Sequence, residues 1–353
     1  MKALLSWERL KPHLPTLVFL FSLLVVAILR YLVVRQHLDM GQDMANYLIT
    51  MNTLFGHDVT GTGLLRPPLI AIPLKLFTLV FGDLNGGKLL GVTASVAMGI
   101  PCYLIARRVS RPWIAVAVSL LFVLTPAYAN MLSWGYITMF GVLFTMLSVY
   151  FYMLTFDSDS KWNALLAGLF GSLVIGFHQL TAAFFVPLCA ILVGALLFTN
   201  RRRGGRYWLN PALGVLAGVV LSLPYVPAYI HLVGMQSGGG GTTTLTGSLI
   251  SLFTIKLWCL PWTWLAVLGL LGALASLLHL WRRDRNATVL LATLFLFPLL
   301  FLLFSLPAPF VELNRRANFF LYVPIWAITG FILSLAWDWR GSLLRPPFRL
   351  AIR

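Results

Sequence analysis

Two aspartates, Asp39 and Asp43, stand directly after the first hydrophobic segment of a chain that has only ten acidic residues. Residues four apart share one face of a helix, with Cβ atoms roughly 6 Å apart. Two carboxylates at the mouth of a membrane helix can take a proton from a hydroxyl group or hold a divalent cation such as Mg²⁺ or Mn²⁺. The alternative interpretation is a solvated loop in which an aspartate caps a helix.

Arginines that could hold a phosphate group lie near the same predicted membrane surface. Arg315 and Arg316 precede the last hydrophobic segment, and Arg66 lies in the long loop after the first one. A planar guanidinium group binds phosphate through paired hydrogen bonds. The alternative is that these side chains only anchor helix ends at the interface. Carboxylates and arginines at one surface, beside apolar helices that could hold a lipid tail, predict transfer of a group from a lipid phosphate carrier.

Further substrate-binding candidates fall at or near the same ends of the predicted helices. They are His57, Asp58, Trp134, Tyr136, His178, Gln179 and Glu312. Each also has a structural explanation. The glutamate could pair with a neighbouring arginine, a lone histidine at a helix end usually satisfies a local carbonyl, and His57 and Asp58 could form a turn. Aromatic residues are common at membrane interfaces without any ligand.

The composition excludes a soluble domain. The chain is 59% hydrophobic and 10% charged, with a mean hydropathy of +0.87, whereas soluble domains carry about 25% charged residues. The net charge of +16 could suggest a nucleic-acid partner. The basic residues, however, form short clusters between apolar segments, which is typical of topology signals, so no nucleic acid is expected. Three cysteines in apolar segments, without partners at metal-ligand spacing, indicate neither a disulfide framework nor a zinc site.

We predict an all-α polytopic membrane protein, with residues 1–353 forming a single transmembrane domain of about ten helices. The first apolar run exceeds the h-region of a signal peptide, has no cleavage site after it and is interpreted as an uncleaved span. The predicted spans are residues 13–34, 88–106, 112–129, 135–155, 162–178, 182–199, 210–230, 257–280, 287–306 and 321–338.

The distribution of positive charge predicts the orientation. Placing the N-terminus inside puts most of the 26 lysines and arginines on the cytoplasmic side, as the positive-inside rule requires. The clusters at 107–111, 201–206 and 282–285 and the basic tail 339–353 then face the cytoplasm. The prediction is a multi-pass plasma-membrane protein with both termini in the cytoplasm and its candidate site on the outer face.

One apolar segment, residues 64–82, does not fit a membrane span. It contains three prolines, Arg66 and Lys75, and prolines and charges at this density are costly in hydrocarbon. A span here would also reverse every later loop. We therefore predict an interfacial helix within a long external loop, residues 35–87. Residues 307–316 are interpreted as the last external loop.

Four features resemble the polytopic GT-C glycosyltransferases, which include oligosaccharyltransferase catalytic subunits, protein O-mannosyltransferases and the lipid A aminoarabinose transferase. The first is the long external loop that opens with acidic residues. The second is an interfacial motif that runs from Arg66-Pro67-Pro68-Leu69 to Phe81-Gly82. The others are Leu104-Ile105-Ala106-Arg107-Arg108-Val109 before a short turn into a span that ends Leu124-Thr125-Pro126, and Asn314-Arg315-Arg316-Ala317 with Tyr322-Val323-Pro324. The resemblance covers most of residues 13–340.

The resemblance implies a transferase that takes a sugar from a polyprenyl-phosphate-linked donor, inverts the anomeric centre and builds a cell-envelope glycan. Asp39 or Asp43 would be the general base, or a cation ligand in metal-using members. Arg315 or Arg316 would hold the donor phosphate. The acceptor could be a glycan, a lipid or a protein.

Two departures from the family pattern keep other functions open. Many members open the loop with adjacent acidic residues, whereas Met40-Gly41-Gln42 separate the two aspartates here. The chain also ends soon after the tenth predicted span, without the external domain that larger members use to grip acceptors. The alternatives are a lipid or lipid-linked-sugar flippase, or a non-catalytic relative acting as a scaffold. Apolar mid-span positions and the lack of mirrored halves argue against transport.

Overall fold

The computed structural model describes residues 11–36, 41–56, 67–125, 136–158, 160–201, 207–227, 276–303 and 311–343 of the chain. Within these ranges the secondary structure is helical, with no strand. The elements in chain order are η1 (Lys11–His13), α2 (Leu14–Val34), α3 (Gly41–Leu54), η2 (Pro68–Ile70), α4 (Ala71–Ala97), α5 (Gly99–Val109), α6 (Pro112–Leu124), α8 (Tyr136–Ser158), α9 (Lys161–Phe177), α10 (Gln179–Asn200), α11 (Leu209–Ser222), η5 (Leu223–Tyr225), α15 (Arg285–Leu303) and α16 (Val311–Leu343). Residues 276–283 form a further helical stretch.

The helices are those of a multi-pass membrane protein, as predicted. In the described part of the chain, five helical stretches are long and apolar enough to cross a bilayer: Lys11–Val34, Pro68–Val109, Thr138–Ser158, Thr181–Asn200 and Phe320–Trp339. Shorter apolar helices lie between them. Helix α2 carries large apolar side chains on its outer surface, since Phe21 is 68% exposed and Leu24 is 57% exposed. Hydrocarbon solvates such a surface, whereas water does not. The number of ten spans stays a prediction.

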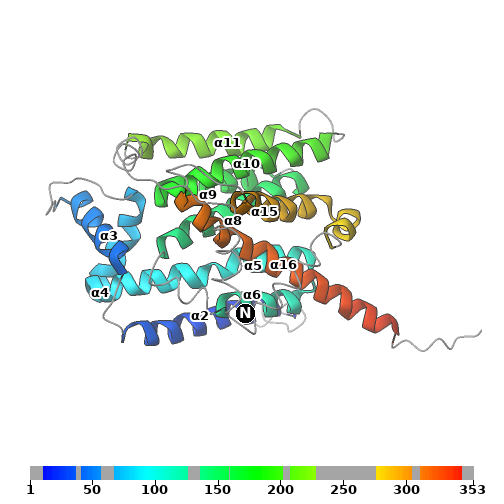
Figure 1. Cartoon of the computed structure of the whole chain (residues 1–353), viewed down its shortest axis with the longest axis horizontal. Coiled ribbons are helices and arrows are strands. Elements are labelled where there is room, and N and C mark those ends of the chain that lie inside the picture. The colour runs from blue at the N-terminus through cyan, green and yellow to red at the C-terminus, as the bar shows by residue number, and fades with distance from the viewer. Residues whose placement is uncertain are drawn as a thin grey trace, which may run out of the picture.

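Most of the long helices run roughly along the long axis of the molecule, so that helix ends gather at two opposite ends (Figure 1). Polar contacts fix which ends meet. Arg108 at the end of α5 binds Asp157 near the end of α8 at 3.2 Å and Asp284 just before α15 at 2.6 Å. Arg111, before α6, pairs with Asp338 near the end of α16. We call this the basic end. Loops predicted to share one membrane side therefore meet there.

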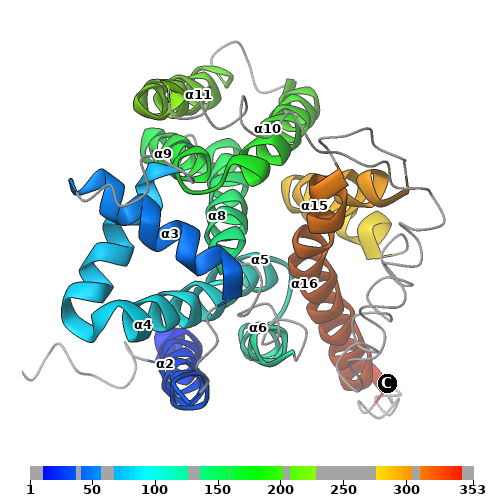
Figure 2. The ribbon, with the colours of Figure 1, turned by 60° about the vertical axis from the view of Figure 1, so that its left-hand side comes forward.

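The opposite end carries the other set of turns. Thr138 near the start of α8 contacts His178 between α9 and α10. Lys88 of α4 donates a hydrogen bond to the carbonyl of Arg35, just after α2. We call this the α3 end, because α3 packs there against α4 (Figure 2). Successive loops were predicted to alternate between the two sides of the membrane, and the described loops do alternate between the two ends. Which side of the membrane each end faces stays a prediction.

Helix α4 contains a sharp turn at a glycine. Gly82 has φ 76° and ψ 165°, a conformation inside α4 that is not helical and that essentially only glycine adopts without strain. It separates a first arm, residues 71–81, from a second arm, residues 83–97. A Cβ on Gly86 would lie 2.7 Å from the backbone of Phe77, so the two arms touch immediately after the turn. The helix predicted within residues 64–82 is thus present, and its place in the interface stays a prediction.

The start of the last helix differs from the sequence prediction. Helix α16 begins at Val311, whereas the predicted span begins at residue 321. Glu312, Arg315 and Arg316 therefore lie on a helix and not in a loop. Hydropathy marks only the apolar part of a helix, and the preceding Leu, Glu, Arg and Ala residues are good helix formers that extend it without being apolar.

Candidate functional site

Helix α3, which follows the first span, is anchored at the α3 end by its buried face. Tyr47 and Met51 on α3 are 5% and 1% exposed, and the hydroxyl of Thr78 on the first arm of α4 lies 3.6 Å from the Met51 sulfur. Asp43 occupies the first turn of α3, where the helix dipole favours a carboxylate. This position suits the capping interpretation as well as the catalytic one. Asp39 lies outside the described residues, so its pairing with Asp43 stays a prediction.

A buried lysine lies close to this junction and was not among the predicted site residues. Lys88 is 6% exposed, and its Nζ is 3.4 Å from the Arg35 carbonyl oxygen, at the start of the segment that leads to α3. A lysine is rarely buried to this extent unless it is paired. The sequence Asn85-Gly86-Gly87-Lys88 signals it, because two small residues next to a charged one let the chain pack closely around that charge.

His178 has a clear local role. The side chain is 6% exposed, and its Nδ1 accepts a hydrogen bond from the backbone N–H of Thr181 at 3.1 Å and lies 2.8 Å from the Thr181 hydroxyl. Its Nε2 lies 3.3 Å from the Thr138 hydroxyl. His178 therefore caps the start of α10 and ties it to α8. The role is local, as in the structural alternative, but the ring accepts from a backbone N–H, whereas a contact with a carbonyl was expected. Contact with a substrate stays a prediction.

An aromatic cluster places the start of α16 at the same end. Phe184 of α10 stacks on Phe320 of α16, with ring centroids 4.1 Å apart, and meets Phe297 of α15 at 5.0 Å. Phe320 is one turn after Arg316, and Phe184 is near the start of α10. The helix starts that carry Gln179 and the two arginines are therefore held close to each other by packed rings, each pair contributing about 1 kcal/mol beyond its buried area.

The fold matches solved structures, although the sequence matches no family. No protein-family model and no curated protein matches the sequence. The solved structure of ArnT from Cupriavidus metallidurans bound to undecaprenyl phosphate matches with a TM-score of 0.62 at 14% identity, over 93% of this chain and 62% of that one. Its apo state matches with a TM-score of 0.61 at 15% identity, over 93% and 61%. This chain thus spans less than two thirds of the length of ArnT.

The chain has the fold of ArnT, an aminoarabinose transferase. The resemblance proposed from the sequence is confirmed at the level of the fold. Because the identity is so low, the likeness does not carry residue roles from ArnT to this chain.

Apart from His178, the predicted site residues fall into two groups. The backbones of Asp43, Tyr136, Gln179, Glu312, Arg315 and Arg316 lie within the first two turns of α3, α8, α10 and α16. Asp39, His57, Asp58, Arg66 and Trp134 lie outside the described residues. The structure therefore tests neither the predicted phosphate contacts nor the predicted base.

The described part of the chain contains no group of three or more His, Cys, Asp or Glu side chains that could hold a metal ion. The side chains of the predicted ligands Asp39 and Asp43 lie outside the described part, so a cation there stays a prediction. Cys102 and Cys189 are both buried and free, as expected for small apolar residues.

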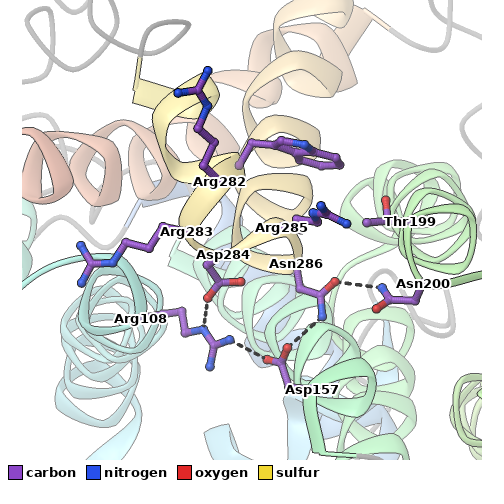
Figure 3. Close-up of a pocket in the computed structure, with 10 residues that line it drawn as sticks. Arg108, Asp157, Thr199, Asn200, Arg282, Arg283, Asp284, Arg285 and Asn286 are labelled. Carbon is purple, nitrogen blue, oxygen red and sulfur yellow. Dashed lines mark hydrogen bonds and ion pairs between the residues drawn. The ribbon is translucent and has the colours of Figure 1, made fainter. Parts of the chain in front are cut away.

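The basic end holds a polar cavity that the sequence did not predict (Figure 3). The basic residues on its walls were interpreted only as topology signals. Only Arg108 among them has acidic partners in the described part of the chain, and these are distant in sequence, since Arg108 is 176 residues from Asp284. No local pattern connects residues so far apart.

Proposed function

We propose that this protein is an integral-membrane glycosyltransferase that takes a sugar from a polyprenyl-phosphate-linked donor at the outer face of the plasma membrane. The observation that carries the proposal is the ArnT-like fold over 93% of the chain. One of the matching ArnT structures holds undecaprenyl phosphate, which is the carrier part of such a donor. The acceptor is a glycan, a lipid or a protein of the cell envelope.

The proposed reaction is a single displacement at the anomeric carbon. A carboxylate, Asp39 or Asp43, takes the proton from the acceptor hydroxyl while its oxygen forms the new glycosidic bond. The bond between the anomeric carbon and the phosphate oxygen breaks, and polyprenyl phosphate leaves with the bonding electrons. Because the acceptor attacks opposite the leaving group, the anomeric configuration inverts. The proton ends on the carboxylate and the negative charge on the phosphate.

Arginines would stabilise the charge that develops on the leaving phosphate. Arg315 and Arg316 lie one turn from the start of α16, which the ring stack of Phe184 and Phe320 holds against α10. Arg66 is two residues before η2 in the sequence and lies outside the described residues. Preorganised donors aimed at a developing negative charge commonly contribute about 3 kcal/mol each to catalysis. The buried Lys88 is a further cation at this end that could serve the same purpose.

The test is donor consumption by purified protein in lipid nanodiscs. A panel of polyprenyl-phosphate sugars is supplied, and release of polyprenyl phosphate is followed for the wild type and for the Asp39→Asn, Asp43→Asn and Arg315→Ala variants. The variant that removes the base is expected to lose activity about 10²–10⁴-fold, which is the usual contribution of a general base. The Arg315→Ala variant is expected to lose about 10²-fold, mainly in kcat.

Asp83→Asn is the matched control. Asp83 is an exposed carboxylate just after the Gly82 turn, in the same predicted external loop, and its loss should leave turnover unchanged. A chelator arm tests the second role of the aspartates, since sensitivity to chelator would assign them to a divalent cation rather than to proton transfer. Lipid binding without turnover of any donor, in the wild type, would favour a flippase or a scaffold and refute the transferase.

A further inference from the structure

The cavity at the basic end lies between the ends of α5, α8 and α10 and the turn that leads into α15. Its volume is about 490 Å³. Its lining contains four arginines and two aspartates, together with polar and aromatic side chains: Arg108, Asp157, Thr199, Asn200, Trp281, Arg282, Arg283, Asp284, Arg285 and Asn286. The lining therefore has an excess of positive charge, and the cavity lies far from the proposed transferase site.

Both carboxylates of the cavity are already occupied by partners within the protein. Asp284 accepts hydrogen bonds from Arg108 at 2.6 Å and, through its other oxygen, from the backbone N–H of Ala287 at 3.0 Å. Asp157 pairs with Arg108 at 3.2 Å and accepts a hydrogen bond from Asn286 at 2.8 Å. Arg108 thus bridges both acids, and the four arginines and two aspartates together give the lining a net charge of +2.

The floor of the cavity is a buried amide pair. Asn200 and Asn286 are 6% and 5% exposed, and the Asn200 amide donates to the Asn286 oxygen at 2.9 Å. This network fixes the orientation of both side chains, because each depends on the other. The walls are consequently held in place before any ligand binds.

Three arginines surround this network without a carboxylate partner among the described residues. Arg282, Arg283 and Arg285 are all exposed, and Arg285 approaches the Trp281 ring at 5.8 Å. Figure 3 shows Arg285 directed toward Thr199, while Arg282 and Arg283 are directed to other sides of the same turn. Such a site attracts a group with more than one anionic oxygen, for which phosphate is the common biological choice.

Apolar surface beside the cavity indicates where the phosphate comes from. Trp281 is 41% exposed, and Leu278, one helical turn before it, is 74% exposed. Phe198 at the end of α10 is 66% exposed, with the Arg201 guanidinium 4.4 Å above its ring. Exposed tryptophan and leucine next to arginines are typical of the boundary between lipid tails and headgroups. Basic pockets between helices on the cytoplasmic side commonly hold anionic headgroups.

We propose that this cavity binds the phosphate headgroup of an anionic phospholipid in the cytoplasmic leaflet, with Arg282 and Arg285 as the main ligands. The acyl chains lie along Leu278 and Trp281. The bound lipid joins the turn before α15 to the end of α10. This assignment does not depend on the transferase activity, since it concerns the opposite end of the molecule.

The test measures the thermal unfolding midpoint of the detergent-purified protein with added short-chain phosphatidylglycerol. The wild type is expected to be stabilised by this lipid but not by short-chain phosphatidylcholine or by inorganic phosphate. The Arg282→Gln, Arg285→Gln double variant should bind phosphatidylglycerol roughly 30-fold more weakly, since each arginine contributes substantially to attraction by an anionic lipid. Its midpoint without lipid reports whether it is folded.

The control removes the same charge at the same end. Lys11 and Lys161 are exposed and do not line the cavity, so the Lys11→Gln, Lys161→Gln double variant should respond to phosphatidylglycerol like the wild type. If both double variants lost the stabilisation by phosphatidylglycerol equally, lipid binding would depend only on net charge, and the proposal would be wrong. Full stabilisation by inorganic phosphate alone, or by phosphatidylcholine, would equally overturn it.

If the Arg282→Gln, Arg285→Gln variant is unfolded without lipid, the Arg282→Lys, Arg285→Lys variant replaces it. This variant keeps the charge and should bind phosphatidylglycerol with intermediate affinity.

Discussion

At the residue scale, Arg108 is the side chain on which three helices converge. It belongs to α5 and contacts Asp157 of α8 and Asp284 before α15. The side chains of the three residues are 34%, 19% and 18% exposed. Removing the arginine would leave two half-buried carboxylates without their shared cation, and such losses are far more costly than the loss of a surface ion pair.

Arg108→Ala is therefore expected to lower the stability of the protein by about 2 kcal/mol, discounted for the remaining exposure. In a thermal melt of a chain of this length this corresponds to a midpoint about 3 °C lower. Arg111→Ala is the matched control, because the Arg111 and Asp338 side chains are 52% and 47% exposed and exposed pairs contribute only about 0–1 kcal/mol. Equal shifts for the two variants would contradict the structural role given to Arg108.

The sequence predicted these residues only in part. The arginine pair at 107–108 was recognised as a topology signal, and the pair does lie at the basic end. Its partners could not be found, because a contact across 176 residues leaves no periodic pattern. For His178, the position at a helix end indicates a local backbone contact, but with a carbonyl, whereas the structure shows the ring accepting from the Thr181 N–H. Glu312, Arg315 and Arg316 were placed in a loop because their polarity hides the start of α16.

At the element scale, the packing of α9 against α11 depends on glycine. A Cβ on Gly168 of α9 would collide with the Gly214 carbonyl oxygen of α11, and a Cβ on Gly214 would lie 2.8 Å from the Ala164 carbonyl oxygen. Gly218 lies four residues after Gly214 on the same face. Helices in membranes associate through such small residues because lipid tails leave close van der Waals packing as a main attraction.

Gly168→Ala is expected to force α9 and α11 apart and to destabilise the protein by about 1–3 kcal/mol, as overpacking usually does. Gly194→Ala on α10 is the control, since a Cβ there meets nothing within 4 Å and alanine is the better helix former by about 1 kcal/mol. The thermal midpoint should fall for the first variant and hold or rise for the second. A Gly168→Ala protein as stable as the wild type would show that the two helices are not in close contact.

Most of the described elements could be predicted from apolar length alone. The predicted spans 13–34, 162–178 and 182–199 correspond closely to α2, α9 and α10. The turn at Gly82 was harder, because its unusual backbone depends on the contact of Gly86 with the first arm of α4. Apolar length reports a helix but not where that helix bends back on itself.

At the scale of the whole molecule, the fold is ArnT-like, while the orientation rests on charge. The predicted cytoplasmic clusters meet at one end, and α3 lies at the other. Labelling of single cysteines in intact cells with a membrane-impermeant maleimide tests the orientation. Cys102 and Cys189 are buried, so they should react little, and Cys259 can be replaced by serine.

Asp83→Cys, next to the Gly82 turn, is expected to react from outside, and Lys161→Cys, at the start of α9, only after the cells are permeabilised. Both positions are exposed, so a difference between them reports the side of the membrane rather than burial. The reverse result would place the α3 end in the cytoplasm and move the proposed site to the wrong leaflet.

The most direct measurement of the central claim follows the fate of the donor itself. Wild-type protein in proteoliposomes is given a polyprenyl-phosphate sugar labelled with ¹³C at the anomeric carbon, together with an extract of cell-envelope acceptors. We predict that polyprenyl phosphate accumulates while the labelled carbon enters a new glycosidic bond of inverted configuration. Recovery of the donor intact, moved from one leaflet to the other, would contradict the account and identify a flippase in its place.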